Sequence, residues 1–241
     1  MQPVAAWLVA RPLNGGLGLV LSLILPMLTS ATSGLGPVVG GLVMAYLVFA
    51  NGVRMAVIQG IGAAIVLGAL AMILKASAAQ VVATAVLIWV PAASLAGLAR
   101  QLKSLTLTLQ VSVILAMVGV LALFVVLGDP AEFWAEMLTQ WTTLVRENGQ
   151  PEYADQLLAS TALIVPQMTM MAVFTMWTWL ILVLLLGYGL FQILPEKKAI
   201  YGRFCDLNYG RVLAAIMAVT SVIAVVTGAT WLQNLALSLI H

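Results

Sequence analysis

Residues 105–128 read LTLTLQVSVILAMVGVLALFVVLG, and no charged residue interrupts them. A helix needs about 20 mainly apolar residues to cross the hydrocarbon core of a bilayer, so this stretch is long enough for one crossing. Further apolar runs lie at residues 15–32, 37–50, 55–74, 81–98, 161–194 and 212–239. This pattern predicts an all-α, polytopic bundle of about seven transmembrane helices, in a single domain that covers residues 1–241.

The composition supports a lipid environment. Hydrophobic residues make up 63% of the chain and charged residues 7%, whereas soluble domains carry about 25% charged residues. No soluble fold could bury so much apolar surface, so we expect the lipid bilayer to be the main partner of the chain. The net charge of +2 gives no indication of nucleic-acid binding.

The few charges fall between the apolar runs, and they predict an orientation. Cytoplasmic loops of membrane proteins are enriched in Lys and Arg. If the N-terminus is cytoplasmic, eight of the 10 cations lie on the cytoplasmic side, namely Arg11, Arg54, Arg100, Lys103, Lys197, Lys198, Arg203 and Arg211. Only Lys75 and Arg146 then lie outside. We therefore expect a cytoplasmic N-terminus and a first span that is retained as an anchor.

Catalytic and metal-binding chemistry finds little support in the sequence. The single histidine is His241 and the single cysteine is Cys205, so neither a His-based nor a Cys-cluster metal site is expected. No carboxylate lies deep in an apolar run, where a proton relay or a cation-coupled transporter would place one. We expect neither enzyme activity nor a metal or other cofactor, and any transport would depend on a partner for its energy.

The main segment outside the membrane is residues 129–160, an acidic insertion. Asp129-Pro130-Ala131-Glu132 has the pattern of a helix start, with a capping Asp, a proline in the first turn and a Glu three residues after the cap. An amphipathic helix is expected to follow, with apolar residues Phe133, Trp134, Met137, Leu138 and Trp141. Two functions stay open for this helix: a lid over an outward-facing cavity, or a helix that lies passively in the outer membrane interface.

Small residues recur every four positions in the third run, at Gly52, Ala56, Gly60, Ala64 and Gly68. Such a ladder makes one helix face flat and lets another backbone approach closely. The partner helix could belong to this chain or to another protein. Gln59 in the same run is costly in lipid, and one interhelical hydrogen bond would satisfy much of its polar side chain.

The connector at residues 195–211 mixes aromatic residues with both signs of charge. Its candidate docking residues are Tyr201, Arg203, Phe204, Asp206 and Arg211. A docking element for a cytoplasmic or membrane partner and a simple positive-inside anchor both explain this mixture.

The stretch GRFCDLNYGRVL at residues 202–213 resembles a connector of the YybS-like family of bacterial membrane proteins, a family of unknown function. The Asn51-Gly52-Val53-Arg54 turn and the junction at residues 128–134 also resemble that family, which implies a bacterial inner-membrane location. The family is distantly similar to the substrate-binding membrane subunits of energy-coupling-factor transporters. Those subunits capture a small molecule from the outer face and couple to a partner protein.

Two functions follow as expectations. The first is a non-enzymatic inner-membrane subunit that packs against membrane or cytoplasmic partner proteins. The alternative is a substrate-capture or permease-like subunit for a small apolar or neutral solute, powered by a partner. An enclosed cavity would favour the alternative, and an exposed small-residue face would favour the first.

Overall fold

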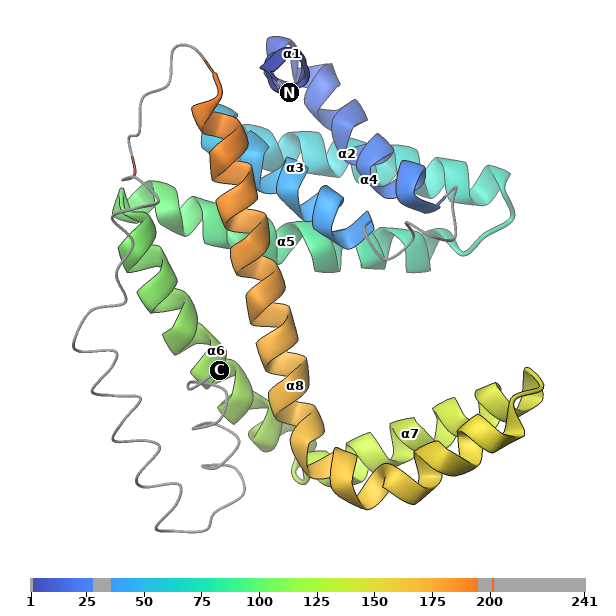
Figure 1. Cartoon of the computed structure of the whole chain (residues 1–241). Helices are drawn as coiled ribbons and strands as arrows, with labels where there is room; N and C mark the ends of the chain where they lie inside the picture. Colours follow the sequence, from blue (N-terminus) through green and yellow to red (C-terminus); the bar gives the residue numbers. More distant parts are fainter. Residues whose placement is uncertain (1, 28–35, 195–200, 202–241) are drawn as a thin grey trace. The chain divides into compact units, whose positions relative to one another are not determined.

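The computed structural model describes residues 2–27, 36–194 and 201. The prediction of an all-α protein is confirmed for these ranges (Figure 1). The helices are α1 (Gln2–Ala10), α2 (Pro12–Met27), α3 (Gly36–Asn51), α4 (Val53–Ile73), α5 (Ala78–Leu102), α6 (Leu105–Leu127), α7 (Pro130–Glu147) and α8 (Pro151–Gln192).

Four stretches of helix are long and apolar enough to cross a membrane: Val53–Ile73, Ala78–Leu102, Leu105–Val126 and Ile164–Gln192. The helices α2 and α3 are apolar too, but each has 16 residues and so covers about 24 Å, less than the roughly 30 Å of hydrocarbon core. The total of about seven spans and the cytoplasmic N-terminus stay predictions. The last apolar run, at 212–239, lies outside the described residues.

The helices group into two compact units. Unit 1 contains α1 to α5, α6 as far as Leu109, and α8 from Thr178 onward. Unit 2 contains α6 from Gln110, α7, and α8 as far as Trp177. The expected single domain stays a prediction.

Helix α3 is the centre of unit 1. It packs against α2, α4 and α5, and its segment from Val43 to Phe49 is buried without interruption. Because neighbours surround it, no side of this helix needs a polar stripe, and its sequence is apolar all round.

The end of α8 lies directly on α3. A Cβ atom at Gly187 would lie 2.9 Å from the Cβ of Ala45 and 3.1 Å from the backbone nitrogen of Tyr46. Only glycine therefore fits at this point, and its lack of a side chain sets how closely the two helices approach.

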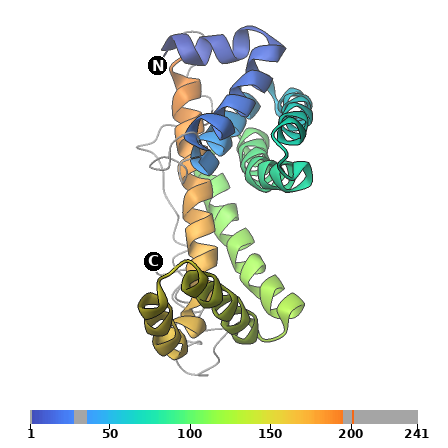
Figure 2. The same ribbon diagram turned by 90° about the vertical axis from the view of Figure 1, so that its right-hand side faces the viewer.

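Helices α4 and α5 lie side by side (Figures 1 and 2). Ser77 begins α5 by accepting a hydrogen bond from the backbone nitrogen of Gln80, at 3.3 Å. The helix then continues through Pro91 to Leu102. The residues on both sides of Pro91 are helical.

In unit 2, the predicted start of α7 is confirmed. The Asp129 carboxylate accepts a hydrogen bond from the backbone nitrogen of Ala131, at 2.9 Å, and Pro130 occupies the first turn. Helix α7 ends at Glu147, and Gly149 takes a positive φ of 81° in the turn to α8.

Helix α8 begins earlier than the expected run at 161–194. It starts at Pro151 and has 42 residues, so the second half of the acidic insertion is its first part. Figure 1 shows α8 changing direction between its yellow and orange parts, and this helix contains Pro166. A proline inside a helix removes one backbone hydrogen bond and is the usual cause of such a bend.

Candidate functional site

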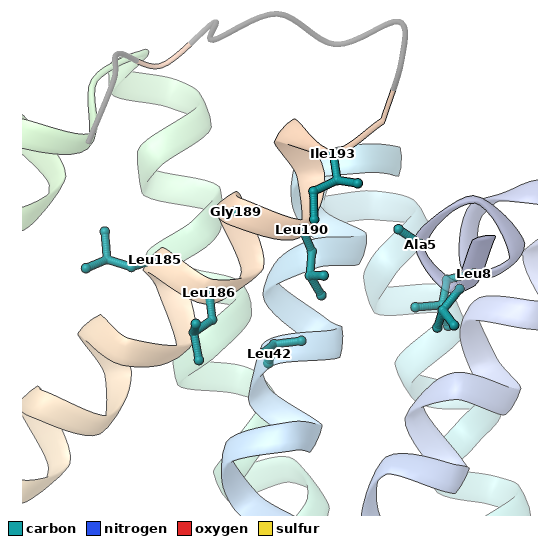
Figure 3. Close-up of a pocket in the computed structure, with 9 residues that line it drawn as sticks. Ala5, Leu8, Leu42, Leu185, Leu186, Gly189, Leu190 and Ile193 are labelled. Atoms are coloured by element: carbon teal, nitrogen blue, oxygen red, sulfur yellow. The ribbon is translucent and has the colours of Figure 1, made fainter. Parts of the chain in front are cut away.

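Unit 1 contains an apolar groove of about 850 Å³ between α1, α3 and α8. Figure 3 shows Ala5 and Leu8 of α1 on one side, with Leu42 of α3 and Leu190 of α8 facing them. The lining residues are all aliphatic or glycine: Val4, Ala5, Leu8, Leu42, Leu185, Leu186, Gly189, Leu190 and Ile193.

The α1 wall of the groove is held in place by polar contacts on its other sides. The Tyr46 hydroxyl donates a hydrogen bond to the backbone oxygen of Ala5, at 2.5 Å. The Asn14 side chain donates to the backbone oxygen of Trp7, at 2.7 Å. Arg11 and Pro12 form the corner between α1 and α2, so a helix too short to span a bilayer is fixed against the bundle.

The chemistry of this groove is that of a hydrocarbon. None of its side chains can donate or accept a hydrogen bond, so it cannot orient a polar group. Its volume lies within the range of about 300–1,000 Å³ that is typical of small-molecule pockets. The groove can therefore select a ligand by shape and apolar surface alone.

An aromatic cluster lies at the end of α8 and includes the first docking residue of the predicted connector. The Tyr201 ring lies 5.6 Å from Phe49, 5.9 Å from Tyr188 and 6.2 Å from Phe191. Its backbone oxygen accepts a hydrogen bond from the backbone nitrogen of Leu105, at 3.0 Å. Tyr201 is only 8% exposed, so its ring anchors the connector to unit 1 and is not itself free to dock a partner.

The other docking candidates, Arg203, Phe204, Asp206 and Arg211, lie outside the described residues. Nearby on unit 1, three cations have different environments. The guanidinium of Arg100 donates to the backbone oxygens of Val48 and Phe49, at 2.7 and 2.9 Å, whereas Arg54 and Lys103 are exposed.

The Arg100 contacts explain the end of α3. The last carbonyl groups of a helix have no partner within the helix, and they carry partial negative charge. Gly52 turns the chain with a φ of +90°. Its backbone nitrogen donates to the oxygen of Val48, at 3.0 Å, so the guanidinium is a second donor to that carbonyl. This cation is therefore a helix cap, and sequence reasoning missed this role because the two positions are about 50 residues apart.

The small-residue ladder faces the inside of unit 1. Ala56, Gly60 and Gly68 are buried, and Gly52 and Ala64 are partly buried. A Cβ at Gly60 would lie 2.9 Å from the Cε of Met44. The ladder thus packs within the chain, which is one of the two possibilities the sequence left open.

Two buried polar groups lie near this ladder. Gln59 donates from Nε2 to the backbone oxygen of Pro12, at 3.0 Å, which is the expected interhelical bond, while its Oε1 has no hydrogen-bond partner. The Nε1 of Trp89 is also buried without a partner. Trp89 and Gly60 help to line a second cavity, of about 140 Å³, which is too small for most ligands.

The predicted lid residues lie on α7 in unit 2. The Trp134 Nε1 donates to the Thr169 hydroxyl, at 2.8 Å, and Leu138 is buried. Met137 is partly buried, but Phe133 and Trp141 are exposed. These residues and the groove belong to different units, so a lid function stays a prediction.

The groove itself could not be predicted from the sequence. Its α8 wall lies inside a long apolar run, where the sequence does not distinguish a leucine that lines the groove from one that does not. One signal could have been used: residues 4–10, VAAWLVA, are too few to cross a bilayer and end at Arg11-Pro12. Such a segment must lie against other helices or in the interface.

Among residues 2–27, 36–194 and 201, no group of three or more His, Cys, Asp or Glu side chains could hold a metal ion. The chain matches no protein-family model, no curated protein and no solved structure.

Proposed function

We propose that this chain is a non-enzymatic, multi-pass subunit of a bacterial inner membrane that holds a small apolar molecule in the groove of unit 1. The groove is the observation that carries the proposal, because it combines a ligand-sized volume with a lining of aliphatic side chains only. A cytoplasmic N-terminus and kinship with the YybS-like family belong to the same proposal.

The source of the ligand determines how it is recognised. A methylene group that moves from water into an apolar site gains about 0.8 kcal/mol. A ligand that arrives from the bilayer gains almost nothing in this way, since lipid tails are as apolar as leucine. Selectivity for such a ligand must come from the fit between its shape and the walls made by α1, α3 and α8.

Two leucines on α8 allow a matched test. Leu186 lines the groove and is 43% exposed, and Leu182, one turn earlier, is 45% exposed but does not line it. Leu186→Trp fills part of the groove. For a ligand taken up from water, the loss of about two methylene groups of contact lowers the affinity about tenfold.

The measurement is the binding of a dansyl-labelled fatty acid to the detergent-purified protein, followed by fluorescence. The proposal expects weaker binding for Leu186→Trp and unchanged binding for Leu182→Trp. Equal binding by both variants would show that the groove is not the site.

A second candidate function is a subunit that packs against partner proteins. Its support is that Tyr201, although not itself available for docking, fixes one point of the connector on unit 1 near the exposed Lys103. The small-residue ladder gives it no support, since its face is used within unit 1.

Co-purification after gentle extraction tests this candidate. We expect the combined change Arg203→Ala and Arg211→Ala to reduce recovery of partner proteins while the chain still inserts into the membrane. Unchanged recovery would contradict a docking function of the connector.

A further inference from the structure

Helix α7 has more apolar surface than its packing uses. At 100° per residue, Trp134, Leu138 and Val145 share one side of the helix, and these side chains are buried or partly buried. A neighbouring stripe contains Phe133, Met137, Trp141 and Leu144. We call these four residues the outer stripe.

Three of the four residues of the outer stripe are exposed within the described part of unit 2, and Met137 is partly buried. Phe133, Trp141 and Leu144 are 41%, 61% and 56% exposed. The opposite side of α7 carries polar residues, among them Glu132 and Glu136. The helix therefore has a packed side, an apolar exposed stripe and a polar side. Among the described residues of unit 2, contacts cover only the packed side.

The position of α7 in the chain limits what can cover the stripe. The candidate span in α6 ends at Val126, and α7 begins at Pro130. A residue extends the chain by at most about 3.6 Å, so the start of α7 lies within about 15 Å of the end of that span. At the other end of α7, a short turn leads to α8. We call α7 and residues 151–163 of α8 the hairpin; α8 then continues into the candidate span Ile164–Gln192.

We propose that the outer stripe is inserted in the membrane interface, with the lipid headgroup and upper acyl region as its partner. Tryptophan and other aromatic side chains favour this depth, and an amphipathic helix at the interface buries its apolar face by about 5–10 Å. Attachment to a candidate span on each side keeps the stripe at the bilayer surface, where this partner is always present.

The charges of the hairpin indicate which lipids fit. Arg146 pairs with Asp155, at 2.6 Å, and the other charged residues of α7 are Glu132, Glu136 and Glu147. A helix with this balance gains nothing from anionic headgroups. The interaction is therefore apolar, and a zwitterionic surface is sufficient for it.

Spin-label accessibility measures this directly. A nitroxide is attached at Trp141→Cys in a Cys205→Ser background, and the full chain is placed in nanodiscs of phosphatidylcholine. Thr143→Cys is the control, because two residues along a helix turn the side chain to roughly the opposite side. Leu144→Cys provides a second position in the stripe if the first variant does not fold.

The proposal predicts that oxygen, which is concentrated in lipid, reaches the label at position 141 while a water-soluble nickel complex does not. At position 143 the nickel complex has access. Adding phosphatidylserine or salt leaves both results unchanged. Access of the nickel complex to position 141 would refute the proposal. Exclusion of both reagents from position 141 would also refute it, and would indicate that a lid contact or a protein partner covers the stripe.

Discussion

The contact between Gly187 and α3 allows a quantitative prediction for the substitution Gly187→Ala. Its new Cβ would lie 2.9 Å from the Cβ of Ala45, 3.1 Å from the Tyr46 nitrogen and 3.3 Å from the Leu42 oxygen. Carbon atoms pack best at about 3.5–4.0 Å, so the helices must separate by roughly 0.6 Å or more. Two of the three neighbours are backbone atoms, which cannot rotate away.

Overpacking of this kind costs about 1–3 kcal/mol. At about 2–4 °C per kcal/mol for a chain of this size, Gly187→Ala should lower the melting temperature by roughly 2–12 °C. The assay is thermal unfolding in mild detergent, followed by tryptophan fluorescence.

Gly62→Ala is the matched control. A Cβ at Gly62 meets nothing within 4 Å, and alanine is the better helix former, so its melting temperature should stay the same or rise. If Gly187→Ala melts at the same temperature as Gly62→Ala, α8 does not pack on α3 as described, and the α8 wall of the groove is misplaced with it.

Three further substitutions test other contacts in the same assay. Arg100→Met removes the cap on α3 and should lower the free energy of unfolding by about 2–3 kcal/mol. Lys103→Met, at an exposed position, should change it by less than about 0.5 kcal/mol. Equal losses of stability in the two variants would show that Arg100 does not cap α3. Gly15→Ala displaces the Gln59 side chain, whose Nε2 would lie 2.7 Å from the new Cβ. It should lower the free energy of unfolding by about 1 kcal/mol, and this loss should vanish in a Gln59→Ala background. A loss that persists in that background would show that Gly15 and Gln59 are not in contact. Arg146→Ala breaks an ion pair whose side chains are 53% and 67% exposed, so it should cost at most about 1 kcal/mol, and less at high salt; a larger loss would mean that the pair is less solvated than described.

Some of this fold could be predicted because the chain marks it with distinctive residues. Asp129-Pro130 begins α7, and the turn around Gly149 ends it, since capping and turn chemistry are local. The buried side of α4 could also be predicted, from its small residues. In lipid the exposed side of the helix is as apolar as its buried side, so the two sides differ in the size of their side chains. The small residues Ala56 and Gly60 are buried, and the large residue Ile65 is 68% exposed.

Other features could not be predicted, because they depend on contacts between distant residues. From the sequence, Arg100 is simply one of the cations of a cytoplasmic loop. Its role as a cap depends on two hydrogen bonds to the end of α3, which is distant in the chain. The groove arises where α1 and α8 meet α3, and its leucines do not differ from those that face lipid. Tyr201 looked available for docking because its partners, Tyr188 and Phe191, belong to an apolar run.

The proposed topology places the turn between α7 and α8 outside the cell and the end of α5 in the cytoplasm. Gln150 in that turn and Gln101 in the last turn of α5 are exposed residues of the same type. Each is replaced singly by cysteine in a Cys205→Ser background, and intact cells are treated with a membrane-impermeant maleimide. We predict labelling of Gln150→Cys at once and of Gln101→Cys only after the cells are opened. Labelling of both in intact cells, or of Gln101→Cys alone, would contradict the account.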